Sequence, residues 1–283
     1  MLALHHVPAP HPEVSRRLLR KLLNQRGWGP PMTDDFEPSP TLARLYPEAA
    51  VGGYTHLDGQ IEFYTRINAL VDQDSHVLDF GAGRGYWAIE PMPEISKRLR
   101  TLKGRVARVV GTDVDEAVLT NPTLDEARVV APGEPLPYDD GTFDVVIADH
   151  VLEHIDAEHA PEVAAEMMRL LKPGGWLAAR TPNKWGMIGV GARAVPNSLH
   201  VKVLDRLQPG RKAEDVFPVR YEMNTRKDLR RLFAGHGVHV YGHASEPTYF
   251  GRSSTMWRVA AGIDRVTPPR LRPTLMVFVQ KGS

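Results

Sequence analysis

The stretch Val77-Leu78-Asp79-Phe80-Gly81-Ala82-Gly83-Arg84-Gly85 decides the fold. A short apolar run leads directly into a glycine-rich turn, which predicts a buried strand, a tight turn and then a helix. Glycines remove the Cβ that would keep a ligand away from the backbone, and a helix N-terminus offers unpaired N–H groups to an anion. The pattern alone fits two ligands: the pyrophosphate of a dinucleotide, or the carboxylate end of an amino-acid cofactor.

An acidic residue in this stretch separates the two ligands. The carboxylate of Asp79 at the strand tip would repel a pyrophosphate but could balance an ammonium or a sulfonium group. The dinucleotide spacing Gly-x-Gly-x-x-Gly is also absent, because position 86 is Tyr. The stretch therefore favours a cationic amino-acid cofactor over a dinucleotide.

Strands and helices alternate on both sides of the glycine-rich turn. Apolar periodicity predicts helices over residues 61–71 and 163–171 and another beginning at 224–229. It predicts further strands at 106–110, 127–131, 143–148, 176–180, 237–241 and 275–279. This alternation predicts an α/β fold with a doubly wound, mostly parallel sheet that is covered on both faces.

Three segments depart from this rhythm. Residues 1–56 begin with an amphipathic helix near 14–23 and continue as a proline-rich arm, which we expect to be irregular and either mobile or wrapped. The basic face of that helix could suit nucleic acid or a membrane surface, but a solvated face is favoured. The segment 183–222 is longer than an ordinary connection and is expected to form a lid over an acceptor. A second irregular segment is expected at 246–273, within a domain spanning 57–283.

Composition excludes several classes of protein. The 283 residues include 35 basic and 34 acidic ones, so a chain-wide basic surface for nucleic acid is excluded, and 42% hydrophobic content argues against disorder. No apolar run is long enough to span a membrane, and the first residues do not resemble a secretory signal. With zero cysteines there is no disulfide and no thiolate chemistry. We expect a cytoplasmic protein.

A second acid, Asp113, ends the strand that follows the glycine-rich turn. Its carboxylate could accept hydrogen bonds from both hydroxyls of a ribose. The alternative is that Asp113 and Asp115 only cap a helix that begins near Glu116. We favour the ribose role because Asp79 and the glycines point to the same crevice.

Two further motifs complete a family pattern: Leu136-Pro137-Tyr138-Asp139-Asp140-Gly141-Thr142-Phe143-Asp144 and Leu170-Leu171-Lys172-Pro173-Gly174-Gly175. With the glycine-rich stretch and Asp113, they resemble class I S-adenosylmethionine-dependent methyltransferases of the small-molecule, methyltransferase-11-like type. The resemblance covers roughly residues 57–245 and the final strand. It implies a Rossmann-like sheet of seven strands with the last one antiparallel, and S-adenosylmethionine lying across the strand ends.

The resemblance also implies roles for individual residues. The methionine part would be held by Asp79, Gly81, Ala82, Gly83 and Gly85, the ribose by Asp113, one adenine face by Val114, and the amino group by Ala148 and Asp149. Many relatives carry Gly-Asp where this chain has Ala131-Pro132. Adenine would then rely on the backbone around Gly133 and on Glu134, and the cofactor would bind less tightly.

The segment Asp149-His150-Val151-Leu152-Glu153-His154 is the densest group of chemically active side chains. If a helix begins near His150, then His150, Glu153 and His154 share one face. His150 could act as a general base, the three residues could hold a divalent cation, or they could be structural. We favour the base, because a hydroxyl acceptor must lose a proton. Three ligands are too few for a metal, so we predict no metal site.

We therefore predict an S-adenosylmethionine-dependent methyltransferase that acts on an oxygen of a small-molecule acceptor, such as a sugar, a nucleotide-sugar or a glycan intermediate. The basic excess of segment 183–222 favours an anionic acceptor, although ordinary surface charge explains it equally well. The alternatives are methylation of an RNA terminus, a non-catalytic cofactor-binding module and a nicotinamide-dependent oxidoreductase. Nucleic acid is not expected as a partner, because the net charge is only +1.

Overall fold

The computed structural model describes residues 37–38, 40–186, 220–246 and 254–282. Residues 38–283 group into one compact unit that contains the sheet. The predicted helix near residues 14–23 and most of the predicted lid at 183–222 lie outside the described residues. The role predicted for each of them stays a prediction.

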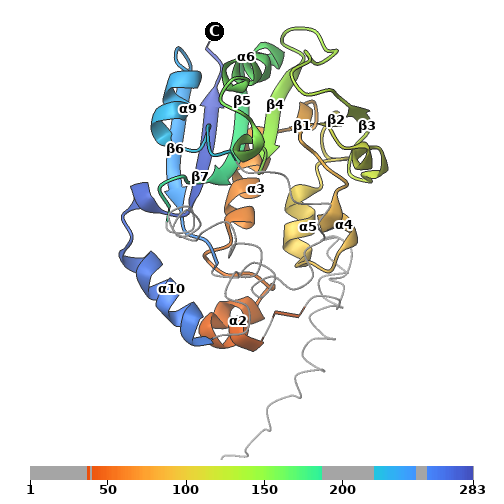
Figure 1. Cartoon of the computed structure of the whole chain (residues 1–283). Helices are drawn as coiled ribbons and strands as arrows, with labels where there is room; N and C mark the ends of the chain where they lie inside the picture. Colours follow the sequence, from red (N-terminus) through yellow and green to blue (C-terminus); the bar gives the residue numbers. More distant parts are fainter. Residues whose placement is uncertain (1–36, 39, 187–219, 247–253, 283) are drawn as a thin grey trace, which may run out of the picture. The chain divides into compact units, whose positions relative to one another are not determined.

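Seven strands form one sheet in the order β3-β2-β1-β4-β5-β7-β6 (Figure 1). They are β1 (His76–Phe80), β2 (Arg108–Asp113), β3 (Glu126–Val129), β4 (Phe143–Asp149), β5 (Leu171–Pro182), β6 (Gly237–His243) and β7 (Thr274–Gln280). Strands β1 to β5 pair in parallel, and β7 is antiparallel to both of its neighbours. This order confirms the predicted doubly wound, Rossmann-like fold with an antiparallel last strand.

Helices pack on both faces of the sheet. The described α-helices are α2 (Pro40–Leu45), α3 (Gly59–Leu70), α4 (Tyr86–Ile89), α5 (Glu94–Arg100), α6 (Ala160–Leu170), α9 (Arg226–Leu232) and α10 (Ser254–Val266). The described 3-10 helices are η1 (Pro47–Ala50), η2 (Glu116–Thr120), η3 (Leu152–His154) and η6 (Pro269–Leu271). No helix of these described segments is both long and apolar enough to cross a membrane.

Alternation along the strands divides the core between the two faces. Val77 and Val145 belong to the cluster that contains Phe63 and Ile67 of α3. The residues that follow them, Leu78 and Val146, belong to the cluster that contains residues of α6 and α9. Every second residue of a central strand therefore faces α3, and the same alternation determines the face on which the acids at the strand tips lie.

Prolines divide the segment that follows the glycine-rich turn. Pro91 and Pro93 lie between α4 and α5, so the chain makes two short helices there instead of one long one. Helix α5 is thereby a separate element, and it packs against α3.

The two segments expected to be irregular contain helices instead. Helices α2 and η1 form within the proline-rich arm, and α10 forms within residues 246–273. Trp257 of α10 is buried with Leu42, Tyr46 and Ala49 in a small separate core. The expectation of irregular structure was wrong here because prolines at the first turn of a helix are tolerated, and because this core joins segments far apart in sequence.

Candidate functional site

Three carboxylates lie at the carboxyl edge of the central strands, on the sheet face toward α3. Asp79 of β1 pairs in register with Gly111 of β2 and Ile147 of β4. Asp113 and Asp149 each lie two residues beyond those partners, so all three acids share one face. The register thus brings together the acids that the sequence singled out on three separate strands.

Two glycines of the turn are required by close packing. Gly81 has φ 76°, and a Cβ there would lie 2.4 Å from Val151 Cγ2. Gly85 has φ 65°, and a Cβ there would lie 2.3 Å from Asn121 Oδ1. Side chains are therefore excluded at both ends of the turn by sterics and by left-handed backbone. A Cβ on Gly83 would meet nothing within 4 Å, so the middle of the turn is open.

Asp113 is bound to this turn and does not cap a helix. Its Oδ2 accepts a hydrogen bond from Gly83 N at 2.8 Å, and its Oδ1 accepts one from Asp115 N at 3.0 Å. The N-cap of η2 is Asp115, whose Oδ1 accepts from Ala117 N at 2.8 Å. The capping alternative therefore applies to Asp115 alone, and the ribose role of Asp113 stays a prediction. Val114 beside it is 48% exposed, as an adenine contact requires.

Asn121 is a residue of the site that the sequence analysis missed. Its buried Nδ2 donates to Ala82 O at 3.2 Å and to Gly83 O at 3.0 Å, while its Oδ1 accepts from Thr123 N at 3.0 Å. These bonds fix the backbone of the glycine-rich turn at Ala82 and Gly83. The Asn121-Pro122 pair after a short helix indicates a turn, but no spacing in the sequence connects it with residue 83.

Asp79 is a carboxyl group without a hydrogen-bond partner among the described residues. Burial raises its pKa to about 7, the guanidinium of Arg100 opposes that rise, and the charges of Asp149 and Asp113 add to it. A cation placed at this carboxylate would be stabilised, whereas a pyrophosphate would meet further negative charge.

Asp149 is paired inside the protein. Arg180 Nε and Nη2 bind its two oxygens at 2.7 and 3.0 Å, and Tyr64 Oη donates to Oδ2 at 3.2 Å. Burial disfavours the charge of Asp149, but the charges of Arg180, His150 and Arg100 and the hydrogen bond from Arg180 together hold the pKa of Asp149 well below its usual range. Arg180 was not predicted, although an arginine at the end of an apolar strand indicates a buried partner. The amino-group role predicted for Ala148 and Asp149 stays a prediction.

His150 and Glu153 meet directly after β4. His150 Nδ1 lies 2.9 Å from Glu153 Oε1, and Thr181 Oγ1 donates to Glu153 Oε2 at 2.9 Å. Glu153 is 3% exposed, whereas the His150 side chain is 47% exposed. His150 has φ 61° and precedes η3, which spans only Leu152–His154. The expectation of one helix face carrying His150, Glu153 and His154 was therefore wrong.

Gly133 and Glu134 lie on the exposed loop after β3. Gly133 has φ 81°, and a Cβ there would come within 3.7 Å of the His159 ring. Glu134 lines a cavity of about 370 Å³ beside Val129 of the edge strand β3. No described contact connects either residue with Asp79 or Asp113, so their role toward adenine stays a prediction.

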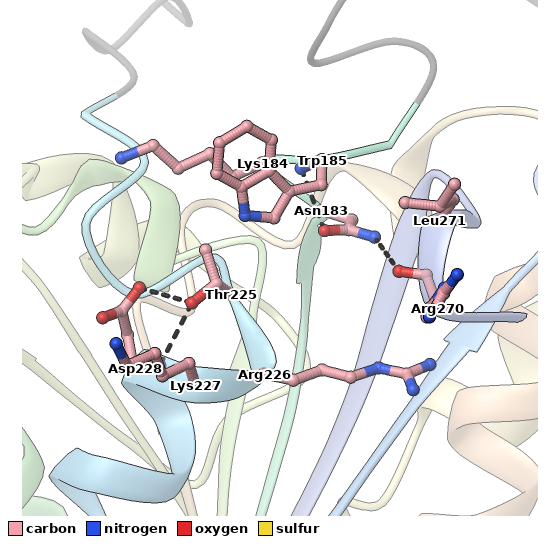
Figure 2. Close-up of a pocket in the computed structure, with 9 residues that line it drawn as sticks. All are labelled: Asn183, Lys184, Trp185, Thr225, Arg226, Lys227, Asp228, Arg270 and Leu271. Carbon is pink, nitrogen blue, oxygen red and sulfur yellow. Dashed lines mark hydrogen bonds between the residues drawn. The ribbon is translucent and has the colours of Figure 1, made fainter.

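A larger cavity of about 410 Å³ lies where β5 ends (Figure 2). Its walls come from the segment after β5, the start of α9 and η6, with Trp185 above and Arg226 below in the view of Figure 2. Asn183 Nδ2 joins two of these walls by donating to Arg270 O at 3.1 Å. Of the basic residues of segment 183–222, Lys184 and Arg220 lie within the described part of the chain. Across that part, no group of three acidic or histidine side chains could hold a metal ion.

Comparison with known proteins agrees with this geometry. The sequence profile of a family described as "Methyltransferase domain" matches residues 78–179, from β1 through most of β5. Residues 78–179 form a class I S-adenosylmethionine-dependent methyltransferase domain. This confirms the predicted family, the enzyme class of the domain and S-adenosylmethionine as its methyl donor.

Curated relatives match part of this chain. A probable S-adenosylmethionine-dependent methyltransferase of Mycolicibacterium smegmatis is 32% identical over 147 residues, which cover 51% of each chain. The ubiquinone/menaquinone biosynthesis C-methyltransferase UbiE of Laribacter hongkongensis is 30% identical over 121 residues, covering 40% of this chain and 46% of its own. The chain thus spans about half the length of these relatives.

A solved structure of an S-adenosylmethionine-dependent methyltransferase from Archaeoglobus fulgidus aligns at 19% identity with a TM-score of 0.49. The alignment covers 83% of this chain and 97% of that one.

The strand tips of the methyltransferase domain fit S-adenosylmethionine. Asp79 offers an unpaired carboxylate to a cation, and the backbone at Gly83 is open to a ligand. Asp113 still has lone pairs free beyond the two backbone N–H groups that it accepts. The cofactor, when bound, supplies a methyl group activated by a positively charged sulfur.

Proposed function

We propose that this protein transfers a methyl group from S-adenosylmethionine to an oxygen of a small-molecule acceptor, with His150 as the general base. The observation that carries the proposal is the contact between His150 Nδ1 and the buried carboxylate of Glu153 at 2.9 Å. A carboxylate only accepts hydrogen bonds, so this contact places a proton on Nδ1. Nε2 is then left as an acceptor on a half-exposed ring.

The surroundings of Glu153 support the orientation of the imidazole. Thr181 Oγ1 donates to the second oxygen of Glu153, and Asn224 Nδ2 donates to Thr181 Oγ1 at 2.5 Å. Asn224 is fully buried, so the chain of bonds is anchored in the core. The carboxylate is fixed at both oxygens, and it in turn fixes the orientation of the His150 ring.

The reaction asks two things of these residues. The acceptor oxygen must be aligned with the methyl group while water is excluded, and orientation of this kind contributes on the order of 7 to 11 kcal/mol. The hydroxyl proton passes to His150 Nε2 as the oxygen forms its new bond, and it leaves to solvent after product release. A base in this position contributes roughly 10²- to 10⁴-fold in rate.

The acceptor proposed here is a sugar, a nucleotide-sugar or a glycan intermediate. The basic residues of segment 183–222, among them Lys184, favour one that bears phosphate or carboxylate. Because one relative is named a C-methyltransferase, carbon is the competing acceptor atom. The position of the new methyl group in the product, determined by NMR, separates the two.

The test is a methyl-transfer assay with a radiolabelled cofactor and a panel of hydroxylated acceptors. His150→Ala should lower turnover roughly 10²- to 10⁴-fold with cofactor affinity nearly unchanged. His239→Ala on β6, whose ring lies against Trp176, is the matched control and should leave turnover unchanged. An unaffected rate in His150→Ala would remove this residue from the mechanism, and binding of the cofactor without transfer to any acceptor would favour a non-catalytic module.

A further inference from the structure

Arg100 is a buried cation beside the strand tips. It is the last residue of α5, and its side chain is only 9% exposed. Its guanidinium lies 4.8 Å from the ring centre of Trp87, 5.0 Å from that of Tyr64 and 5.9 Å from that of Tyr86. Tyr86 and Trp87 directly follow the glycine-rich turn, so Arg100 lies next to the proposed cofactor position.

The guanidinium of Arg100 is incompletely paired. Within the described residues it makes one hydrogen bond, from Nη1 to Gln60 Oε1 at 3.0 Å, and its buried Nε has no partner. The nearest carboxylate oxygen, Asp149 Oδ2, is 3.9 Å from Nη2, which is beyond hydrogen-bond distance. Arg180 by contrast binds both oxygens of the same carboxylate. A buried charge without a hydrogen-bonded counter-ion is costly unless a ligand completes it.

The charges at this edge identify the missing partner. Two buried arginines lie at this edge: Arg180 is paired with Asp149, and Arg100 lies near Asp149 and Asp79 without a hydrogen-bonded carboxylate. S-adenosylmethionine carries a sulfonium, an ammonium and one carboxylate, so it brings one net positive charge and a single anionic group. Arg180 binds both oxygens of Asp149, whereas Arg100 Nε has no hydrogen-bond partner in the described part of the chain.

We propose that Arg100 binds the α-carboxylate of the methionine part of S-adenosylmethionine. This inference rests on the proposed function and extends it, because it assigns a cofactor contact to Arg100 as well as to the acids of the site. The aromatic rings hold the guanidinium beside the turn, and Gln60 on α3 fixes its rotation. The break between α4 and α5 at Pro91 and Pro93 is what allows the end of α5 to reach this place.

The experiment compares two ligands that differ only in the carboxylate. S-adenosylhomocysteine and its decarboxylated counterpart, S-adenosyl-3-thiopropylamine, are titrated calorimetrically into the wild-type 283-residue chain and into Arg100→Met. We expect the wild type to prefer S-adenosylhomocysteine by roughly 10- to 100-fold, as a charged hydrogen bond implies, and Arg100→Met to lose that preference. Arg98→Met, an exposed arginine on the same helix, should retain it.

Each outcome is decisive. A preference that persists in Arg100→Met overturns the proposal. An equal loss of affinity for both ligands also overturns it, because it indicates that Arg100 only joins α5 to α3. If Arg100→Met does not fold, Arg100→Lys keeps the charge but not the planar fork, and a reduced preference supports the same role. A wild type that binds neither nucleoside refutes the proposed function itself, and one that binds both equally refutes only this inference.

Discussion

The tips of β1 and β4 each carry a carboxyl group, and the pKa values of the two groups are shifted in opposite directions. Asp79 has no hydrogen-bond partner among the described residues, and burial raises its pKa to about 7. Asp149 is also buried, but Arg180 and Tyr64 bind it and its pKa is held well below the usual range. The comparison shows that the protein pairs Asp149 and leaves Asp79 without a hydrogen-bond partner among the described residues. We propose that a cationic cofactor supplies the partner that Asp79 lacks.

The largest effect is expected at the paired acid. Arg180→Met leaves the charge of Asp149 buried without its counter-ion, which should lower the free energy of unfolding by about 3 to 5 kcal/mol. Urea denaturation at pH 7 measures it. Arg231→Met is the control, because its partner Asp228 forms an exposed pair and the change should stay within about 0.5 kcal/mol. A loss below about 1 kcal/mol in Arg180→Met would mean that Asp149 is not held by this pair.

The next effect concerns the unpaired acid and depends on pH. The pKa of Asp79 in the folded protein lies above its ordinary value of 3.8, so the folded state binds this proton more tightly than the unfolded state does. The resulting stability is complete below pH 3.8 and is lost as pH rises through about 7. The free energy of unfolding of Asp79→Asn should therefore equal that of the wild type at pH 4. At pH 8 it should be higher than that of the wild type, by at most about 4 kcal/mol.

Denaturation curves of the wild type and Asp79→Asn at several pH values check this sign. A constant difference between the two proteins from acid to alkaline pH would show that Asp79 titrates normally.

A smaller effect, on cofactor affinity, is expected at Asp113 at the tip of β2. Asp113→Ala should weaken binding of S-adenosylmethionine by roughly 1 to 3 kcal/mol, because a charged hydrogen-bonding group is lost from the ribose. The matched control is Asp115→Ala, which removes the N-cap of η2 and should cost about 1 kcal/mol of stability with little change in affinity. Calorimetric titration distinguishes them, and equal affinities for wild type and Asp113→Ala would refute the ribose assignment.

The β1 side of the site was predictable from the sequence because its information is local. Strand, turn and acid follow one another between Val77 and Gly85, and apolar alternation predicted the strands around them. The seven-stranded sheet with an antiparallel last strand was implied by the family resemblance. The prediction of Asp113 needed only the next strand. Local patterns of this kind express backbone geometry, which neighbouring residues largely determine.

The pairs that complete the site could not be predicted in the same way. Asp149 with Arg180, His150 with Glu153 and Thr181, and Asn121 with the turn all depend on register between strands or on loop geometry. The left-handed backbone at His150 replaced the expected helix and rearranged the trio. Arg100 is positioned by a helix break whose consequence appears only when α5 packs on α3.

The central claim is that the carboxylates at these strand tips accept a cationic sulfur nucleoside and reject a pyrophosphate. Isothermal titration of the wild-type protein at pH 8 with S-adenosylmethionine and, separately, with NAD tests it most directly. We predict saturable binding of S-adenosylmethionine and no detectable heat with NAD. Binding of NAD with none of S-adenosylmethionine would contradict the account.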